Sequence, residues 1–246
     1  MMKIDILTLF PDMCNAFINE SVIGRAVASG KVEIECHNIR DYTLDKHNRV
    51  DDAPYGGGMG MIMQAQPIYD CCKSVLNGCD NARVIYMSPE GSVFNQKKAC
   101  ELAESCDRLV LICGHYEGVD QRVIEELGAE ELSVGDYVLT GGELPALIVA
   151  DAVSRLLPGV LSDDICFEEE SHYSGLLEYP QYTRPAVWKE REVPEVLLSG
   201  HHANIVKWRR EQSLKNTFIK RRDMLKNATL NENDIEFLKK CEKNNE

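Results

Sequence analysis

Ser-Val-Gly-Asp-Tyr-Val-Leu-Thr-Gly-Gly-Glu-Leu-Pro, from Ser133 to Pro145, is the stretch that decides the fold. Its apolar residues Tyr137-Val138-Leu139 predict a short strand, which breaks at Gly141-Gly142 and leads into a helix over Glu143–Leu156. Glycine adopts positive φ and lets other groups approach the main chain closely. The first N–H groups of a helix lack intrahelical partners, so a ligand can bind them, and proline suits the first turn. The competing interpretation is an ordinary strand-to-helix connection.

The chain around this stretch alternates strands and helices. Further strands are predicted over Ile4–Phe10, Val32–Ile39, Ala82–Met87 and Arg108–Cys113. Helices are predicted over Asn15–Ser29, Gln66–Leu76, Gln96–Glu104 and Asp120–Leu127. This alternation is typical of an α/β domain with a mostly parallel sheet.

Three of the predicted strands end in glycine-bearing loops, namely Ser88–Gly91, Gly114–Gly118 and Gly135–Gly142. Ligands gather at the carboxyl ends of parallel strands, so these loops predict a pocket. A fourth loop, Arg40–Met63, carries four glycines between residues 56 and 60 and is too long to be an ordinary connection. Its spacing does not match Gly-x-Gly-x-x-Gly, so a nicotinamide-dependent oxidoreductase is a distant alternative.

Composition indicates a soluble chain of 246 residues, long enough for one large or two small domains. No stretch has the roughly 18 uncharged apolar residues that a membrane span needs, and the N-terminus lacks a signal-peptide pattern. We therefore expect a cytoplasmic protein without membrane contact. The ten cysteines contain no Cys-x-x-Cys pair, which favours buried, reduced thiols and no metal site.

Charge is distributed unevenly. The chain has a net charge of −13, yet Arg184–Lys226 contains 11 Lys and Arg against 5 Asp and Glu, a local +6. A basic segment on an acidic body indicates phosphate binding, although a solvated basic helix face would look the same. Helices are predicted over Ala203–Asn227 and, with Asn231 as cap, over Asn231–Asn244. We therefore divide the chain into an α/β domain (1–160), a flexible acidic linker (161–175) and a second, helical domain (176–246).

Several motifs are specific enough to identify a family. Asp45-Lys46-His47 and the run from Val50 to Met61 resemble the N-terminal signature of the bacterial tRNA (guanine-N1)-methyltransferases that modify guanosine 37. Cys113–Gly118 and Ser133–Pro145 are similar to that family's cofactor loops, and Leu197–His202 resembles its C-terminal motif. The resemblance runs nearly end to end. It implies the SPOUT superfamily fold, in which a C-terminal trefoil knot in the parallel sheet precedes a small all-α domain.

The resemblance also implies ligands and partners. S-adenosylmethionine is expected in the knot, Mg²⁺ is expected to assist without a dedicated protein site, and a homodimer is expected to share its active sites. The second domain is expected to bind the anticodon arm of tRNA. The implied cofactor-binding residues are Tyr86, Met87, Ser88, Pro89, Gly91, Gly114, Tyr116, Glu117, Val134, Gly135, Asp136, Tyr137, Val138, Leu139, Gly141, Gly142 and Pro145. The expected substrate-binding residues are His47, Asp51, Gly58, Ser199, His201, Lys207, Arg209, Arg210 and Lys215.

Two catalytic residues follow from the same resemblance. Guanine N1 carries a proton that a base must remove, and negative charge then grows towards O6, where a cation stabilises it. The family's cation corresponds to Arg155, which could otherwise be a simple partner of Asp151. The family's base is an Asp in an Asp-Ser-Phe sequence, whereas this chain reads Glu170-Ser171-His172. Glu170 is therefore the expected base, with His172 next in line.

The chain is thus expected to methylate N1 of guanosine 37 in tRNA, with guanosine preferred at position 36. The alternatives are a SPOUT methyltransferase for another RNA site and a non-catalytic RNA-binding relative. The glycines at 141 and 142 are expected to lie against the cofactor, so valine at either position should abolish its binding and leave the fold largely intact.

Overall fold

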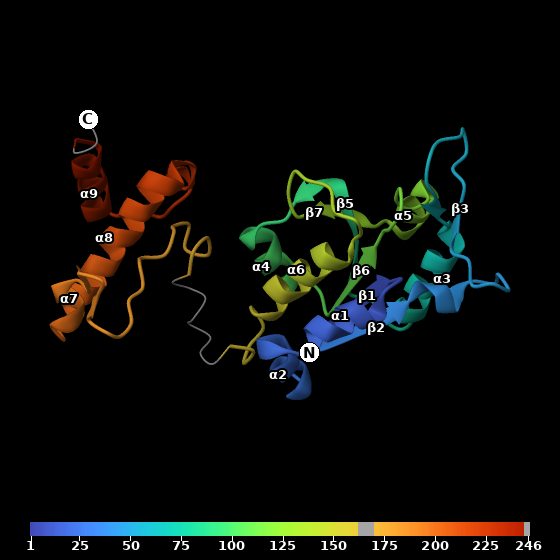
Figure 1. Ribbon diagram of the computed structural model, residues 1–246, viewed down its shortest axis with the longest axis horizontal. Coiled ribbons are helices and arrows are strands. Elements are labelled where there is room, and N and C mark those ends of the chain that lie inside the picture. Colours follow the sequence, from blue (N-terminus) through green and yellow to red (C-terminus); the bar gives the residue numbers. More distant parts are fainter. Residues whose placement is uncertain (162–169, 244–246) are drawn as a thin grey trace. The chain divides into compact units, whose positions relative to one another are not determined.

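A five-stranded parallel sheet organises the N-terminal part of the chain (Figure 1). In the computed structural model, which describes residues 1–161 and 170–243, the strand order is β2-β1-β6-β5-β7. All neighbouring pairs run parallel, which confirms the predicted α/β class. The strands are β1 (Lys3–Thr8), β2 (Glu33–Asn38), β5 (Ala82–Val93), β6 (Arg108–Cys113) and β7 (Glu130–Ser133).

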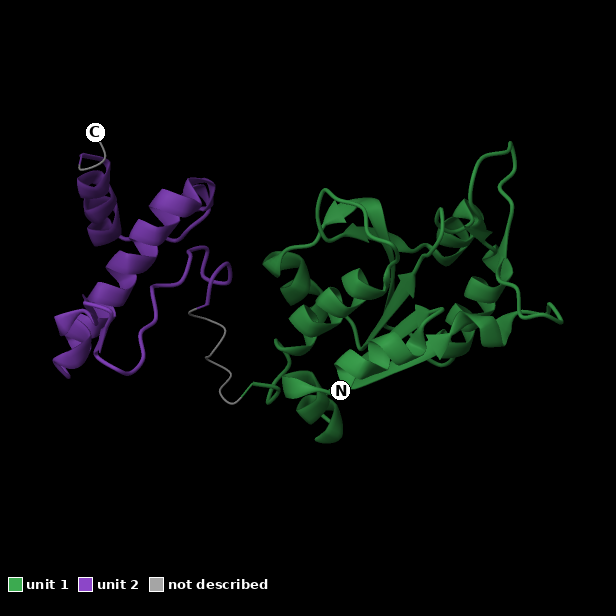
Figure 2. Ribbon diagram, in the orientation of Figure 1, with its two compact units in different colours: residues 1–164 green, residues 165–246 purple. Residues whose placement is uncertain are grey.

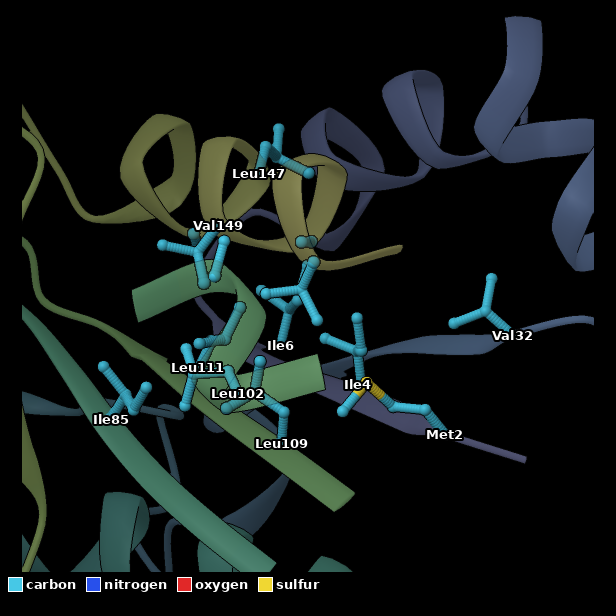
Figure 3. Close-up of a cluster of buried hydrophobic side chains, with 14 of the residues drawn as sticks. Met2, Ile4, Ile6, Val32, Ile85, Leu102, Leu109, Leu111, Leu147 and Val149 are labelled. Carbon is cyan, nitrogen blue, oxygen red and sulfur yellow. The ribbon is translucent and has the colours of Figure 1, made fainter. Parts of the chain in front are cut away.

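Helices cover both faces of this sheet, because side chains of successive strand residues point to opposite faces. Ile4, Ile6 and Leu111 point to one face, where Leu102 of α4 and Val149 of α6 pack on them (Figure 3). The helices on this side are α1 (Pro11–Ile18), α2 (Ser21–Ala28), α4 (Gln96–Ser105) and α6 (Glu143–Ser154). The opposite face carries α3 (Ala65–Leu76), α5 (Gln121–Leu127) and the 3-10 turn η1 (Ile39–Tyr42).

The predicted single helix over Asn15–Ser29 is wrong, because the chain forms α1 and α2 with a break after Asn19. Ser21, the first residue of α2, has a positive φ of 57°, which the interior of a continuous α-helix does not accommodate. A Cβ at position 24 would collide with the Asn19 carbonyl. Because Gly24 lacks one, α2 can begin close to the end of α1. The break therefore depends on a contact that hydrophobic periodicity does not reveal.

The predicted turn at Ser88–Gly91 lies inside β5. The strand pairs with β7 up to Met87, shifts register, and pairs again from Ser92. Pro89 is tolerated there because an irregular stretch of strand needs no ladder hydrogen bond from it. A Cβ on Gly91 would collide with the backbone of Glu131 and Leu132, so glycine is required where the two strands approach.

The chain divides into two compact units, residues 1–164 and 165–246 (Figure 2). Most of the predicted linker falls on residues 162–169, which lie outside the described residues. The second unit contains α7 (Glu195–Leu198), α8 (His202–Lys220), η2 (Arg222–Lys226) and α9 (Glu232–Lys243). It is not purely helical, because β8 (Val187–Trp188) and β9 (Arg191–Glu192) form an antiparallel hairpin. In neither described range, 1–161 or 170–243, is any helix both long and apolar enough to cross a membrane.

A helix cap and a buried carboxylate hold the C-terminal helices together. The predicted continuous helix over Ala203–Asn227 is wrong, since α8 ends at Lys220 and a 3-10 turn follows. The Asn231 cap is confirmed: its Oδ1 accepts from the Asp234 N–H, while Asp234 Oδ2 accepts from the Asn231 N–H, both at 3.0 Å. Arg210 of α8 donates to the same buried Asp234 at 2.8 Å and 3.2 Å, which joins α8 to α9.

A buried carboxylate joins three strands of the sheet. Asp5 of β1 is fully buried, and its oxygens lie 2.7 Å from His37 Nε2 of β2 and 2.7 Å from Arg108 Nε of β6. Burial raises the pKa of a carboxyl group, but the hydrogen bonds from His37 and Arg108 outweigh burial here. The pKa of Asp5 therefore lies below its ordinary value, and the ion pair contributes stability at neutral pH.

We expect Asp5→Asn to lower the free energy of unfolding by about 3 kcal/mol at pH 7, because Arg108 loses a buried partner. Because the folded-state pKa is depressed, this contribution is present above the unfolded pKa, near 4, and is lost as pH falls through the folded pKa. Urea unfolding at pH 7 and at pH 3–4 measures both effects. The control is Glu35→Gln, because Glu35 is a half-exposed partner of Lys3. It should lower the free energy of unfolding by no more than about 0.5 kcal/mol. Equal losses in the two variants would contradict the assignment.

Candidate functional site

A cavity of about 330 Å³ opens at the carboxyl ends of β5, β6 and β7. Its walls are the irregular part of β5 at Ser88–Glu90, the loop Gly114–Val119 after β6, and the segment Val134–Gly142 after β7. These are the three loops that the sequence predicts to converge. The volume is typical of a pocket for a small organic ligand.

Most of the expected cofactor-binding residues line this cavity. They are Tyr86, Met87, Ser88, Pro89, Gly114, Tyr116, Glu117, Val134, Tyr137, Val138, Leu139, Gly141, Gly142 and Pro145. Gly91, Gly135 and Asp136 do not line it. Gly91 instead packs on β7, and Gly135, at φ 147°, forms the turn after β7.

The predicted strand at Tyr137-Val138-Leu139 is wrong, and these residues form an exposed loop. The strand ends earlier, at Ser133, because its hydroxyl accepts from the Gly135 N–H at 3.2 Å and donates to the Gly135 carbonyl at 3.0 Å. The apolar side chains of this stretch therefore face the cavity and solvent. Val138 is 83% exposed, which suits a wall that a ligand covers.

Gly142 is required by a close approach of two backbone segments. Its N–H donates to the Gly114 carbonyl at 2.8 Å, and a Cβ at this position would lie 2.7 Å from Cys113 Cα. The φ of Gly142 is an ordinary −80°, so a positive φ is not the reason that glycine is required here. A Cβ on Gly141 would instead collide with side chains, those of Glu143 and His115. From this geometry we expect a Gly142→Val variant to disturb the fold as well as the cavity.

The start of α6 is attached to β1 by a buried carboxylate. Glu143, the first residue of the helix, is 3% exposed, and its Oε1 accepts from Thr8 Oγ1 at 2.8 Å. Thr8 in turn accepts from the Phe10 N–H at 2.9 Å. A carboxylate at a helix N-terminus is stabilised by the helix dipole. Pro145 lies in this first turn, as predicted.

His115 lines the cavity and was not among the predicted residues. Its Nδ1 accepts from the Tyr116 N–H at 3.0 Å, so Nε2 carries the proton of the neutral ring. The ring lies 5.1 Å from that of Phe10. The next residue, Tyr116, has a positive φ of 59°, an uncommon value for a side chain of this size. Membership of the Cys113–Gly118 motif was the available signal for His115.

The cavity is acidic. Glu90, Glu117 and Glu131 contribute carboxylates to its lining, which contains no Lys or Arg within the described part of the chain. Burial raises the pKa of Tyr86, and the charges of Glu131 and Glu90 raise it further. Such a lining favours a ligand that carries positive charge.

The glycine-bearing loop Arg40–Met63 packs against one wall of the cavity. The Glu117 N–H donates to the Met61 carbonyl at 3.0 Å, and the Met63 N–H donates to the Gly118 carbonyl at 2.9 Å. Gly60, at φ 88°, leaves room that the Glu117 side chain occupies. Two short strands, β3 (Asp51–Asp52) and β4 (Ile62–Met63), flank this loop. The structure thus brings Gly60–Met63 beside the cavity. The predicted residues Asp51 and Gly58 are not among the described residues that line it, and His47 lies on an exposed turn that precedes β3.

The two expected catalytic residues belong to different units, Arg155 to the first and Glu170 to the second. Arg155 directly follows α6. Burial raises the pKa of Asp151, and the positive charge of Arg155 opposes that rise. Glu170 precedes a turn held by the His172 N–H, which donates to the Leu176 carbonyl at 3.0 Å, and by Ser171 Oγ, which accepts from the Glu178 N–H at 2.9 Å.

The expected RNA-binding residues differ in what holds them. Lys207 and Lys215 are exposed on α8, and Lys207 makes only a 3.9 Å contact with Glu211. Arg209 stacks over Tyr179 at 4.8 Å, while Arg210 is committed to Asp234. Ser199 and His201 lie in the exposed junction between α7 and α8, where Ser199 Oγ accepts from the His201 N–H at 3.2 Å.

One cluster of potential metal ligands occurs in the described residues, at Asp5, Glu35 and His37. Both Asp5 oxygens are already bound by Arg108 and His37, and Lys3 lies 3.1 Å from Glu35, so this is an ion-pair network. The nine cysteines at described positions are free, and burial raises the pKa of Cys72 to about 12. Five of these nine thiols are buried, as expected, and the other four are half-buried.

Known proteins resemble this chain over nearly its whole length. Residues 2–227 match the family model described as tRNA (Guanine-1)-methyltransferase TrmD. A relative named tRNA (guanine-N(1)-)-methyltransferase from Ruminiclostridium cellulolyticum is 58% identical over 224 residues, which are 91% of this chain and 96% of the relative. Relatives with the same name from Alkaliphilus metalliredigens and Dehalococcoides mccartyi are 51% and 52% identical, covering 100% and 96% of each chain respectively.

We expect Gly142→Ala to destabilise the fold, because the new methyl group would meet the Cys113 backbone, which cannot rotate away. Overpacking of this kind typically costs about 1–3 kcal/mol. Gly118→Ala is the comparison: its Cβ would meet only the Tyr86 hydroxyl at 3.6 Å, and its φ of 115° costs about 1–2 kcal/mol of local strain. Urea unfolding measures both variants, and a Gly142→Ala protein as stable as the parent would refute the close approach.

Proposed function

Since this chain belongs to the tRNA (guanine-1)-methyltransferase family, we propose that it transfers a methyl group from S-adenosylmethionine to N1 of guanosine 37 in tRNA, preferring guanosine at position 36. The observation that carries this proposal is the cavity formed by the irregular part of β5 and by the glycine-bearing segments that follow β6 and β7. Its position is where α/β sheets bind ligands. A methyl transfer to another RNA site and a role in binding without catalysis are the alternatives.

The lining of the cavity fits S-adenosylmethionine. Its sulfonium and ammonium groups are positive, and the lining offers carboxylates from Glu90, Glu117 and Glu131. Backbone donors and acceptors of the three loops suit the edges of an adenine and a ribose. When bound there, S-adenosylmethionine supplies a methyl carbon made electrophilic by the attached sulfonium.

The chain's own residues would supply the proton transfer and the charge stabilisation. Glu170 is proposed to accept the proton of guanine N1, which frees the nitrogen lone pair for attack. Arg155 is proposed to stabilise the negative charge that develops towards O6. The ordered turn that follows Glu170 supports this role, because it fixes one end of the residue's backbone.

The path of the chain around the cavity supports a trefoil knot. After β7, at the edge of the sheet, the segment 134–142 returns past the ends of β5 and β6. The following α6 then packs against α1, α4, β1 and β6. We propose that this return threads the chain through the loops of β5 and β6.

The helical unit is proposed to bind the anticodon arm. Its basic segment, Arg184–Lys226, supports this role, and Lys207 and Lys215 are exposed cations of α8 suited to phosphates. Arg210 is better assigned to its bond with Asp234.

Mg²⁺ would act without a dedicated protein site. Buried free thiols support a reducing compartment, in keeping with a cytoplasmic enzyme.

An apolar patch supports the proposed homodimer. Five large side chains of α1, its cap and α6 are between 41% and 48% exposed, and the two helices contact one another. They are Phe10, Met13, Phe17, Leu144 and Ile148. Contiguous apolar surface of this kind marks an interaction site, and two copies of one patch can pair about a two-fold axis. Catalytic residues from both subunits would then share each active site.

Glu170→Gln should lower the rate of methyl transfer by roughly 10²–10⁴-fold, the usual effect of removing a general base. The measurement is single-turnover methylation of a tRNA transcript that carries guanosines at positions 36 and 37, over a pH series. Binding of S-adenosylmethionine and of tRNA, followed by calorimetry, should change little.

Glu170→Asp should retain activity, because it keeps the carboxylate. Glu169→Gln is the matched control, since it removes the same charge one residue away. If Glu170→Gln reacts as fast as the parent, the base lies elsewhere, and His172→Gln is then the next variant. A parent protein that binds both ligands without methyl transfer would support the non-catalytic alternative.

Ile148→Glu should convert the dimer to a monomer, because burying a carboxylate in an apolar contact costs more than the contact contributes. Light scattering after size-exclusion chromatography gives the mass directly. Leu44→Glu changes an exposed leucine outside the patch and should leave the mass unchanged. A parent that is already monomeric at micromolar concentration would contradict the dimer.

A further inference from the structure

The hairpin formed by β8 and β9 has a rigid, two-residue turn. Val187 pairs with Glu192 and Trp188 with Arg191, so Lys189 and Glu190 form the turn. Both turn residues have positive φ, 47° and 64°, as a type I′ turn requires. The Val193 N–H extends the ladder by donating to the Ala186 carbonyl at 2.9 Å.

The two faces of this hairpin differ in chemistry. Directly opposed residues of paired strands point to the same face, and successive residues point to opposite faces. One face therefore carries Trp188 and Arg191, and the other carries Val187 and Glu192. Lys189 Nζ also lies 4.9 Å from the centre of the Trp188 ring. An aromatic ring and two cations thus gather on one face, while the carboxylate of Glu192 lies on the other.

Trp188 is 59% exposed, although the indole is the largest apolar side chain and usually lies buried. Every residue from Thr183 to Glu192 is exposed, so the hairpin projects from its own unit. The hairpin also belongs to the basic segment Arg184–Lys226. A flat ring beside cations on a rigid support matches the two parts of a nucleotide, the base that stacks and the phosphate that carries charge.

We propose that the Trp188 face of the hairpin is an RNA-binding site, on which an unpaired base of the tRNA stacks while Lys189 and Arg191 contact the neighbouring phosphates. This inference rests on the proposed function, because it takes tRNA as the substrate. The base must be unpaired, since bases within a helix stack on each other and expose no free ring face. The site would add affinity and orientation without reading a particular base.

The chain contains two tryptophans, which allows a direct spectroscopic test. Trp208 packs beside Tyr182 with ring centres 6.3 Å apart, so Trp208→Phe keeps an aromatic contact there. In this variant Trp188 is the sole tryptophan. Its fluorescence should be quenched on titration with a tRNA transcript, and tRNA should protect it from quenching by acrylamide.

Affinity measurements with matched variants test the energetic role. Trp188→Ala should weaken tRNA binding by about 5- to 150-fold, the range for loss of one base–aromatic stack. Val187→Ala, on the opposite face and similarly exposed, should change affinity less than 2-fold. Arg191→Gln should flatten the log–log salt dependence by about 0.7–0.9, whereas Trp188→Ala should leave the slope unchanged because indole carries no charge.

Each further outcome decides between the proposals. The Trp188→Ala defect should vanish with a fully paired RNA duplex; a defect of equal size with the duplex would overturn stacking. Tryptophan emission that changes with protein concentration in the absence of RNA would assign the face to a protein contact instead. Normal tRNA affinity of Trp188→Ala, with methylation intact, would remove the hairpin site and leave the proposed function standing. Absence of methylation by the parent would instead remove the proposed function.

Discussion

The approach of Gly142 to the end of β6 is the contact on which the rest of the first unit depends. The Gly142 N–H donates to the Gly114 carbonyl, and no side chain fits between the glycine and Cys113. This contact returns the chain from the edge strand β7 to the middle of the sheet and sets where α6 begins. Glu143 then bonds to Thr8, which attaches the helix to β1. The cavity exists because the returning segment forms its third wall.

The two units differ in the charge of their candidate binding regions. The cavity of the first unit is lined by carboxylates, as suits a positively charged methyl donor, whereas the second unit holds the basic segment suited to RNA. Within that segment the cations are not equivalent. Arg210 serves the α8–α9 contact through Asp234, Arg209 stacks on Tyr179, and Lys189 and Arg191 flank an exposed indole. The 11 Lys and Arg residues of this segment are therefore more than the number of cations available to phosphate.

Local patterns predicted much of the fold. The strand Arg108–Cys113 was predicted to the residue, and the Asn231 cap was confirmed, because both depend on near neighbours in the sequence. The loops after β5, β6 and β7 were also expected to meet, since parallel strands end at one edge of a sheet. The strand at Tyr137–Leu139 was wrong because a serine turn, which periodicity does not show, ends β7 at Ser133. The sequence analysis also missed His115, Glu90 and Glu131 as parts of the cavity, because periodicity does not show which side chains line a cavity.

The sequence by itself determined the α/β class, the family and most residues of the pocket, because these are carried by alternation, motifs and glycine placement within short stretches. Only the tertiary structure decided what each glycine and each cation is for. Gly142 is required by a backbone segment 28 residues earlier in the chain, and Arg210 by a carboxylate 24 residues later. Contacts between distant segments depend on how the elements pack, and no local pattern encodes which backbone or carboxylate will lie opposite.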